Sequence, residues 1–191
     1  EVNAKMGLIC ATPTAGSAGV VSGVLMAVRE RLALTRAQQV DFLFTAGAFG
    51  LVIANNASIS GAEGGCQAEI GSASAMAAAA LVCAKGGTPH QAAQAVAITL
   101  KNMMGLICDP VAGLVEVPCV KRNALGSSQA FISADMALAG IESVIPPDEV
   151  VLAMYQVGRQ MPSIFKETAE GGLAMTPTAQ RLQAEILEAN R

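Results

Sequence analysis

Three of the five cysteines stand in loop sequence that is rich in glycine and proline. Cys66 follows two glycines, Cys108 precedes a proline by two positions, and Cys119 directly follows a proline. Loops that carry thiolates are typical of metal sites, but the closely spaced pairs of zinc fingers and the cysteine runs of ferredoxins are absent from the sequence. Three widely spaced ligands indicate an incomplete coordination sphere, which on a cubane iron–sulfur cluster would leave one iron open as a Lewis acid. From spacing alone, free thiols remain the simpler interpretation.

The other two cysteines carry no metal-site signal. Cys83 ends an alanine-rich run and is expected to pack as a small hydrophobic residue, whereas Cys10 stands beside a polar loop and is ambiguous. The number of cysteines is odd and the first residues lack the pattern of a secretory leader. A disulfide framework is therefore not expected, and we predict a cytoplasmic chain.

Two polar loops are candidates for binding. Residues 12–19 join hydroxyl groups to small residues directly before a helix, where free backbone N–H groups could receive an anion, although a capped turn is the simpler interpretation. Residues 55–66 carry amides and hydroxyls between an apolar helix and a nearly uncharged one. We expect these groups to lie inside the molecule, where unpaired polar atoms need partners or a ligand.

Helices must position these loops, because helix-capping signals recur and no segment alternates with period two. Thr35 with Gln38 and Thr88 with Gln91 have the spacing of a capping box, and further helix starts carry a proline. We predict an all-α fold: one compact domain, residues 1–191, of packed and largely apolar helices with cluster-binding and substrate-binding loops. The expected helices lie near residues 16–33, 35–54, 66–84, 88–104, 123–140, 148–160 and 177–189.

Charge is scarce in the middle of the chain. The sequence is 52% hydrophobic, 14% charged and 3% aromatic, with a net charge of −3. Residues 64–115 contain only Glu69, Lys85, Lys101 and Asp109 as charged residues, so their helices must be buried on several sides. Nucleic-acid binding is not expected without a basic surface. Membrane spans are not expected either, because polar clusters break the longest uncharged runs, residues 6–28 and 42–62.

Three segments carry a long and specific pattern: residues 11–17 (ATPTAGS), 55–69 (NNASISGAEGGCQAE) and 108–119 (CDPVAGLVEVPC). Together they resemble the α chain of the iron–sulfur-dependent bacterial L-serine dehydratases. The resemblance runs from the first residues to about Thr178 and includes both intervals between the three loop cysteines. It implies that Cys66, Cys108 and Cys119 hold a [4Fe-4S] cluster whose fourth iron is left for substrate.

The resemblance also implies a reaction, the β-elimination of water from L-serine to give pyruvate and ammonia through aminoacrylate. Hydroxide leaves poorly, so an open iron on the serine hydroxyl would stabilise the departing oxygen while a base removes the α-proton. It argues against pyridoxal phosphate, the usual alternative for this reaction. No Schiff-base motif is recognisable around Lys5, Lys85, Lys101, Lys121 or Lys166.

A base is the gap in this chain. His90 is the only histidine, and its place at a helix start favours a solvent-facing role. In the family, the histidine proposed as base lies in a Ser-Ser-His-Thr segment of the β domain, which is a separate polypeptide in two-chain members. The resemblance thus implies that the chain is inactive alone and needs a β chain in a homo- or hetero-oligomer.

Substrate contacts are expected from both polar loops. For the first loop we predict that the serine carboxylate meets the hydroxyls and N–H groups of Thr12, Thr14, Gly16 and Ser17. For the second we predict that Asn55, Asn56 and Ser58 orient the amino or hydroxyl group, with cap and core-network roles as the alternative.

Residues 121–123 follow the last cysteine of the pattern and leave two readings open. Lys121 and Arg122 could stabilise the charge of a cluster, or they could form an ordinary exposed helix start. Two other functions also stay open: a non-enzymatic helical domain whose thiols serve subunit packing, and a related lyase that acts on another hydroxy or amino acid. Family α chains extend further at the N-terminus, so we expect a missing segment to cover part of this core.

Overall fold

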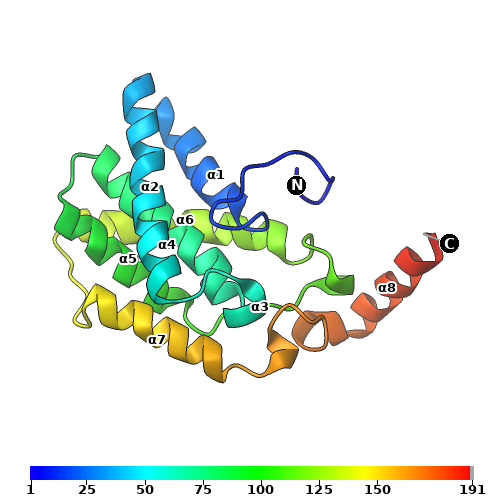
Figure 1. Ribbon diagram of the computed structural model, residues 1–191. Coiled ribbons are helices and arrows are strands. Elements are labelled where there is room, and N and C mark those ends of the chain that lie inside the picture. The colour runs from blue at the N-terminus through cyan, green and yellow to red at the C-terminus, as the bar shows by residue number, and fades with distance from the viewer. Residues whose placement is uncertain (190–191) are drawn as a thin grey trace.

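The computed structural model describes residues 1–189, which form eight α-helices and three short 3-10 helices (Figure 1). Within these residues there is no β-strand, and a single parallel bridge joins Cys108 to Lys166. The predicted all-α fold is confirmed. The predicted domain ends at residue 191, and its last two residues lie outside the described part. The elements are α1 (Ala18–Arg29), α2 (Arg36–Asn56), α3 (Gly61–Gly64), α4 (Cys66–Ala84), α5 (Pro89–Met103), η1 (Val111–Gly113), α6 (Cys119–Leu138), α7 (Pro147–Gln160), η2 (Ser163–Phe165), η3 (Gly172–Met175) and α8 (Pro177–Ala189).

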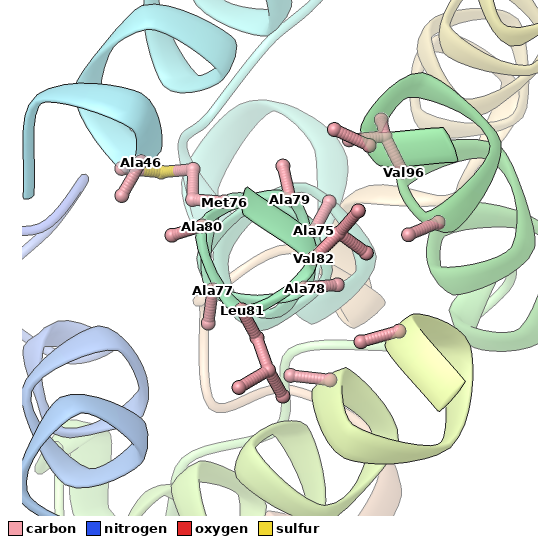
Figure 2. Packing of buried hydrophobic residues seen from close by; sticks show 14 of the residues in the cluster. Ala46, Ala75, Met76, Ala77, Ala78, Ala79, Ala80, Leu81, Val82 and Val96 are labelled. Atoms are coloured by element: carbon pink, nitrogen blue, oxygen red, sulfur yellow. The ribbon is translucent and has the colours of Figure 1, made fainter. Parts of the chain in front are cut away.

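Helix α4 is the axis of the molecule. It contacts α1, α2, α5, α6 and α7, and every residue from Cys66 to Val82 is buried. Viewed along its axis, its alanines point outward on several sides toward the surrounding helices, with Ala46 of α2 beside Met76 and Val96 of α5 across from Val82 (Figure 2). Small side chains let the neighbouring backbones approach on all sides. The burial predicted for the charge-poor stretch is confirmed here.

Helix α2 is apolar too, but only one side of it is covered. Phe42, Ala46, Gly50 and Ile53 form its buried stripe. Its other side exposes large apolar side chains, namely Leu43, Phe44, Leu51 and Val52. By length and composition both α2 and α4 could cross a membrane, yet the apolar window of α4 is 94% buried in the protein and that of α2 is 22% buried.

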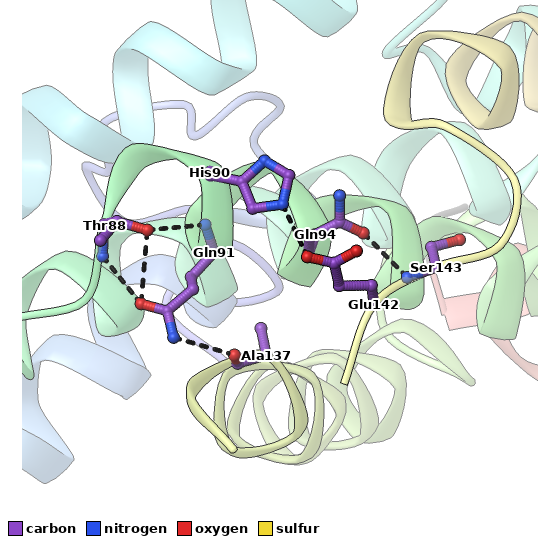
Figure 3. Close-up of polar contacts among 7 residues, drawn as sticks. All are labelled: Thr88, His90, Gln91, Gln94, Ala137, Glu142 and Ser143. Atoms are coloured by element: carbon purple, nitrogen blue, oxygen red, sulfur yellow. Dashed lines mark hydrogen bonds and ion pairs between the residues drawn. The ribbon is translucent and has the colours of Figure 1, made fainter. Parts of the chain in front are cut away.

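The connection from α4 to α5 lies far from the loop cysteines. Thr88 caps α5 in a capping box with Gln91, whose Nε2 donates to the carbonyl oxygen of Ala137 at 3.2 Å (Figure 3). His90 has an exposed side chain beside Glu142, at 2.9 Å, which confirms its solvent-facing position (Figure 3). Because α4 has 19 residues, it separates this end from Cys66 by about 28 Å.

Two local predictions differ from the structure in an informative way. Helix α6 begins at Cys119 rather than near residue 123, with Pro118 at its N-cap. Residues 61–64 form the single-turn helix α3, capped by the Ser60 hydroxyl, where only a loop was expected. Because α6 begins at Cys119, this cysteine lies at a helix N-terminus and not in a loop.

Candidate metal and substrate site

The three loop cysteines are all buried in the interior. Cys66 and Cys119 are the first residues of α4 and α6, and Cys108 lies between α5 and η1. Their exposed fractions are 1%, 6% and 2% respectively. A helix N-terminus carries partial positive charge, which favours a thiolate, and two of the three sulfurs lie at such a terminus, where burial opposes the effect.

Gln67 fixes the start of α4 against two other segments. Its Nε2 donates to the carbonyl oxygen of Met154 in α7 at 3.0 Å, and its Oε1 accepts from the N–H of Gly105 at 2.8 Å. Gly105 opens the connection that leads to Cys108. This one buried amide therefore sets the position of Cys66 relative to the segment that carries Cys108.

A carboxylate joins two of the thiols. The sulfurs of Cys66 and Cys108 and a carboxylate oxygen of Glu69 lie within 4.8 Å of one another, and all three residues are buried. Glu69 follows Cys66 by one helical turn, so both project from the same side of α4. Cys119 stands outside this close group, but the charge of Cys66 contributes to the pKa of its thiol.

The thiols differ in how readily they ionise. The Cys108 thiol donates to the Cys66 sulfur, and this hydrogen bond lowers the pKa of Cys66 and raises that of Cys108. The guanidinium of Arg122 assists, with Nη1 3.5 Å from the Cys66 sulfur. Burial, followed by the charge of Cys66, raises the pKa of Cys119 to about 12. Without a metal, Cys66 is therefore the thiol of the group that ionises most readily.

Arg122 is held between the cysteines and a buried acid. Its Nη1 lies 2.8 Å from Oδ1 of Asp109 and donates to the carbonyl oxygen of Ile107 at 2.9 Å, and its side chain is 14% exposed. The other carboxylate oxygen of Asp109 accepts from the N–H of Leu173 at 2.8 Å. Of the two readings for residues 121–123, the exposed helix start holds for Lys121 and is wrong for Arg122.

The first polar loop packs directly on Glu69. The Thr14 hydroxyl donates to Oε1 of Glu69 and lies 2.8 Å from the Ser17 hydroxyl. A Cβ on Gly16 would come within 2.8 Å of the same carboxylate oxygen, so only glycine allows this approach. Nδ2 of Asn123 in α6 donates to the Gly16 carbonyl oxygen at 2.7 Å. The loop thus brings the start of α1 beside those of α4 and α6.

A cavity of about 420 Å³ opens next to this loop. Thr12, Gly16, Cys119 and Asn123 are among its lining residues. The Thr12 hydroxyl itself donates to the carbonyl oxygen of Cys10 at 3.2 Å. The cavity gives a small molecule a path to one of the three cysteines.

The second polar loop behaves differently. Asn55 and Asn56 are exposed, and Nδ2 of Asn56 donates to the carbonyl oxygen of Val52 at 2.8 Å. Their expected burial is wrong, because α2 continues to Asn56 and presents this turn to solvent. Ser58 is buried, but its hydroxyl donates to Glu63 at 2.6 Å. In the described residues none of the three side chains makes a hydrogen bond to a cysteine.

Gly61 is the residue of that loop whose backbone lies beside the Cys108 sulfur. A Cβ placed on it would lie 3.1 Å from Oε2 of Glu69, 3.4 Å from the Cys108 sulfur and 3.4 Å from Oε2 of Glu167. Sequence reasoning missed both carboxylates. Glu69 did carry a signal, because it is one of four charged residues in the charge-poor stretch and stands one turn after Cys66. Glu167 carried none, since it lies 59 positions after Cys108 in a charged region.

The chain is similar to a known family over most of its length. It matches the family model described as serine dehydratase alpha chain over residues 1–174. The chain belongs to the serine dehydratase alpha chain family. The predicted resemblance is thereby confirmed, and the residues matched to this family contain all five cysteines and both polar loops.

Three relatives give the extent of the similarity. The probable L-serine dehydratase, alpha chain, of Bacillus subtilis (strain 168) is 70% identical over 186 residues, which are 97% of this chain and 62% of the relative. Its counterpart in Latilactobacillus sakei is 60% identical over 97% of this chain and 89% of the relative. The L-serine dehydratase, alpha chain, of Peptoniphilus asaccharolyticus is 53% identical over 98% of this chain and 64% of the relative. The chain thus spans just under two thirds of the first and third.

Proposed function

We propose that this chain is the α subunit of an iron–sulfur-dependent L-serine dehydratase, which releases pyruvate and ammonia from L-serine in the cytoplasm. The observation that carries the proposal is the close approach of Cys66, Cys108 and Glu69, with Thr14 hydrogen-bonded to Glu69, beside the starts of α1 and α4. The names of the relatives support the same reaction and the existence of a further subunit.

Cys66, Cys108 and Cys119 would hold a [4Fe-4S] cluster. Three buried thiols suit such a cluster chemically, and Arg122 with two helix N-termini offsets its negative charge. When bound through three cysteines, the cluster supplies an open iron that acts as a Lewis acid on the serine hydroxyl. Ligand thiols must lose their protons on binding metal, so uptake is favoured as pH rises.

The first polar loop would hold the substrate. The hydroxyls of Thr12, Thr14 and Ser17 and the backbone around Gly16 lie at the positive end of α1, which suits a carboxylate. Oε2 of Glu69 has no hydrogen-bond partner in the described residues and would accept from the substrate ammonium group. The predicted substrate contacts of Asn55, Asn56 and Ser58 gain no support from the positions of their side chains.

The α-proton would be removed by a base outside this chain. His90 is separated from Cys66 by the length of α4 and is occupied by Glu142. The proposal therefore includes a β chain that supplies the base within an oligomer. It also excludes pyridoxal phosphate, a proposal supported by the lysines: none of the five is buried, and Lys85 pairs with Asp135 at 2.6 Å.

Anaerobic reconstitution followed by iron and acid-labile sulfide analysis tests the cofactor. About four irons per chain are expected for the parent chain and for Cys83→Ser, and fewer than one for Cys66→Ser. Near-normal iron content in Cys66→Ser would overturn the ligand assignment. Loss of iron from both variants alike would point to unfolding, so circular dichroism of each variant accompanies the analysis.

Turnover of L-serine, L-threonine and D-serine tests the activity. The loaded chain should be inactive alone and should release pyruvate from L-serine once a β chain is added. Appreciable turnover by the chain alone would contradict the need for an external base. Faster turnover of another amino acid would assign the site to a related lyase.

A further inference from the structure

A second pocket adjoins the cysteine site, between α3, α4, α7 and the segment that follows α7. Its volume is about 310 Å³, which is at the lower end for small-molecule sites. Met154 and Ala68 provide apolar lining, and Ser58 and Glu63 line it from the second polar loop. This pocket has no role in the proposed dehydratase reaction.

The charges in this pocket are unbalanced. Arg159 and Lys166 both line it, and in residues 1–189 neither has an acidic partner within salt-bridge distance. Glu63 is the one acid of the lining and already accepts from the Ser58 hydroxyl at 2.6 Å. The Tyr155 hydroxyl, also in the lining, makes no hydrogen bond within the described part. Arg159 and Tyr155 are exposed and Lys166 is half-buried, so two cations and one donor face the pocket without a partner in the described part of the protein.

We propose that this pocket binds a small carboxylate with a short apolar tail. Arg159 and Lys166 would hold the carboxylate, since a guanidinium and an ammonium give charge-assisted hydrogen bonds to it. Met154 and Ala68 would contact the tail. A volume of about 310 Å³ accommodates such a molecule, and the two apolar side chains of the lining can cover only a short tail.

The same short segment serves this pocket and the cysteine site. The N–H of Cys108 donates to the carbonyl oxygen of Phe165 at 2.9 Å. The N–H of Glu167 donates to the carbonyl oxygen of Cys108 at 3.4 Å. Lys166 lines the pocket, whereas Glu167 lies with Gly61 beside the Cys108 sulfur. A carboxylate bound by Lys166 would therefore be coupled to Cys108 through this backbone. If carboxylate binding changes the metal affinity of the cysteine site, metal binding must change the carboxylate affinity by the same factor.

Titration of the full metal-free chain with sodium propionate, at constant ionic strength, tests the proposal. Amide chemical shifts are followed by nuclear magnetic resonance. Saturable shifts are expected at Lys166 and Arg159, together with shifts at Cys108 and Glu167. The test requires neither cluster nor serine, so its failure would leave the proposed dehydratase function intact.

Variants define the ligands of the carboxylate. Arg159→Gln with Lys166→Gln should raise the Kd for propionate at least tenfold, whereas Lys101→Gln with Arg181→Gln, which removes the same charge elsewhere, should change it less than twofold. Glu63→Gln should tighten binding severalfold by removing the opposing charge. If the first pair fails to fold, Arg159→Gln alone should still weaken binding at least threefold.

Three results would overturn the proposal. The first is the absence of saturable shifts in the parent chain, and the second is equal weakening in the two charge-matched pairs. The third is binding of inorganic phosphate as tightly as propionate, because a site for any anion makes no use of the apolar lining.

Discussion

Helices α4 and α2 have nearly the same apolar character and opposite surroundings. The surrounding helices bury α4 on every side, whereas α2 buries one stripe and exposes Leu43, Phe44, Leu51 and Val52. The difference lies in side-chain size, because most residues of α4 are Ala, Ser or Gly, whereas α2 carries Phe, Leu and Val on its outer side. Small residues admit neighbouring backbones on all sides, and this packing also fixes the buried end where Cys66 and Glu69 stand.

The largest effect is expected where charge is buried near that end. Asp109→Ala would leave Arg122 without its partner in the interior and should destabilise the chain by about 3 kcal/mol. Asp135→Ala breaks the more exposed pair with Lys85 and should cost below about 1 kcal/mol. Urea unfolding followed by circular dichroism measures both. Similar losses would mean that the buried pair lies in a far more hydrated site than its exposure indicates.

The same substitution on the two helices tests the packing directly. Ala77→Leu in α4 inserts three carbons into a fully buried site and should destabilise by about 1–3 kcal/mol or more. Ala48→Leu in α2 is on the exposed side and should stay within about 0.5 kcal/mol. Thermal unfolding of the two variants gives the comparison. A tolerated Ala77→Leu would break the contrast between the helices.

Replacing a glycine by alanine should change stability in opposite directions in α6, which packs on α4, and in α2. A Cβ on Gly126 of α6 would meet Ile70 of α4 at 2.9 Å and Val20 at 3.1 Å, so Gly126→Ala should destabilise by about 1 kcal/mol. Gly47 of α2 has open space around it, and Gly47→Ala should stabilise by about 0.5–1 kcal/mol through helix propensity. Urea midpoints at constant m-value report both. Two changes of the same sign would contradict the assigned packing.

The smallest effect concerns pH. Burial raises the pKa of Glu69 in the native metal-free chain, although the Thr14 hydrogen bond opposes this. A raised native pKa means that the related stability is complete below the unfolded pKa, about 4.3, and is lost as pH rises through the native value. Glu69→Gln should therefore gain stability relative to the parent chain as pH increases over that interval. Glu30→Gln on the exposed end of α1 is the control, and an equal trend in both variants would refute the assignment to burial.

The sequence predicted most of the helices because their capping signals are local. The capping boxes at Thr35 and Thr88 form as expected. It also predicted the burial of α4, because residues 64–115 carry only four charged residues and helices of that composition must be covered by other elements. The side-chain contacts within the site could not be predicted from local sequence. Thr14 and Glu69 are 55 positions apart, and the Arg122–Asp109 pair depends on how α6 packs. The predicted burial of Asn55 and Asn56 was wrong, because a polar side chain alone does not indicate which side of a helix end faces solvent.

The origin of the site in four distant segments has a consequence for the order of assembly. The hairpin of α4 and α5 closes through a short connection and needs few distant contacts, whereas the cysteine site requires residues 14, 66, 108 and 122 to meet. Long loops close more slowly than short ones, so we expect the α4–α5 hairpin to form before the thiols are brought together. Iron would then be loaded into a chain that is already folded, and a chelator that strips it should leave the helices standing.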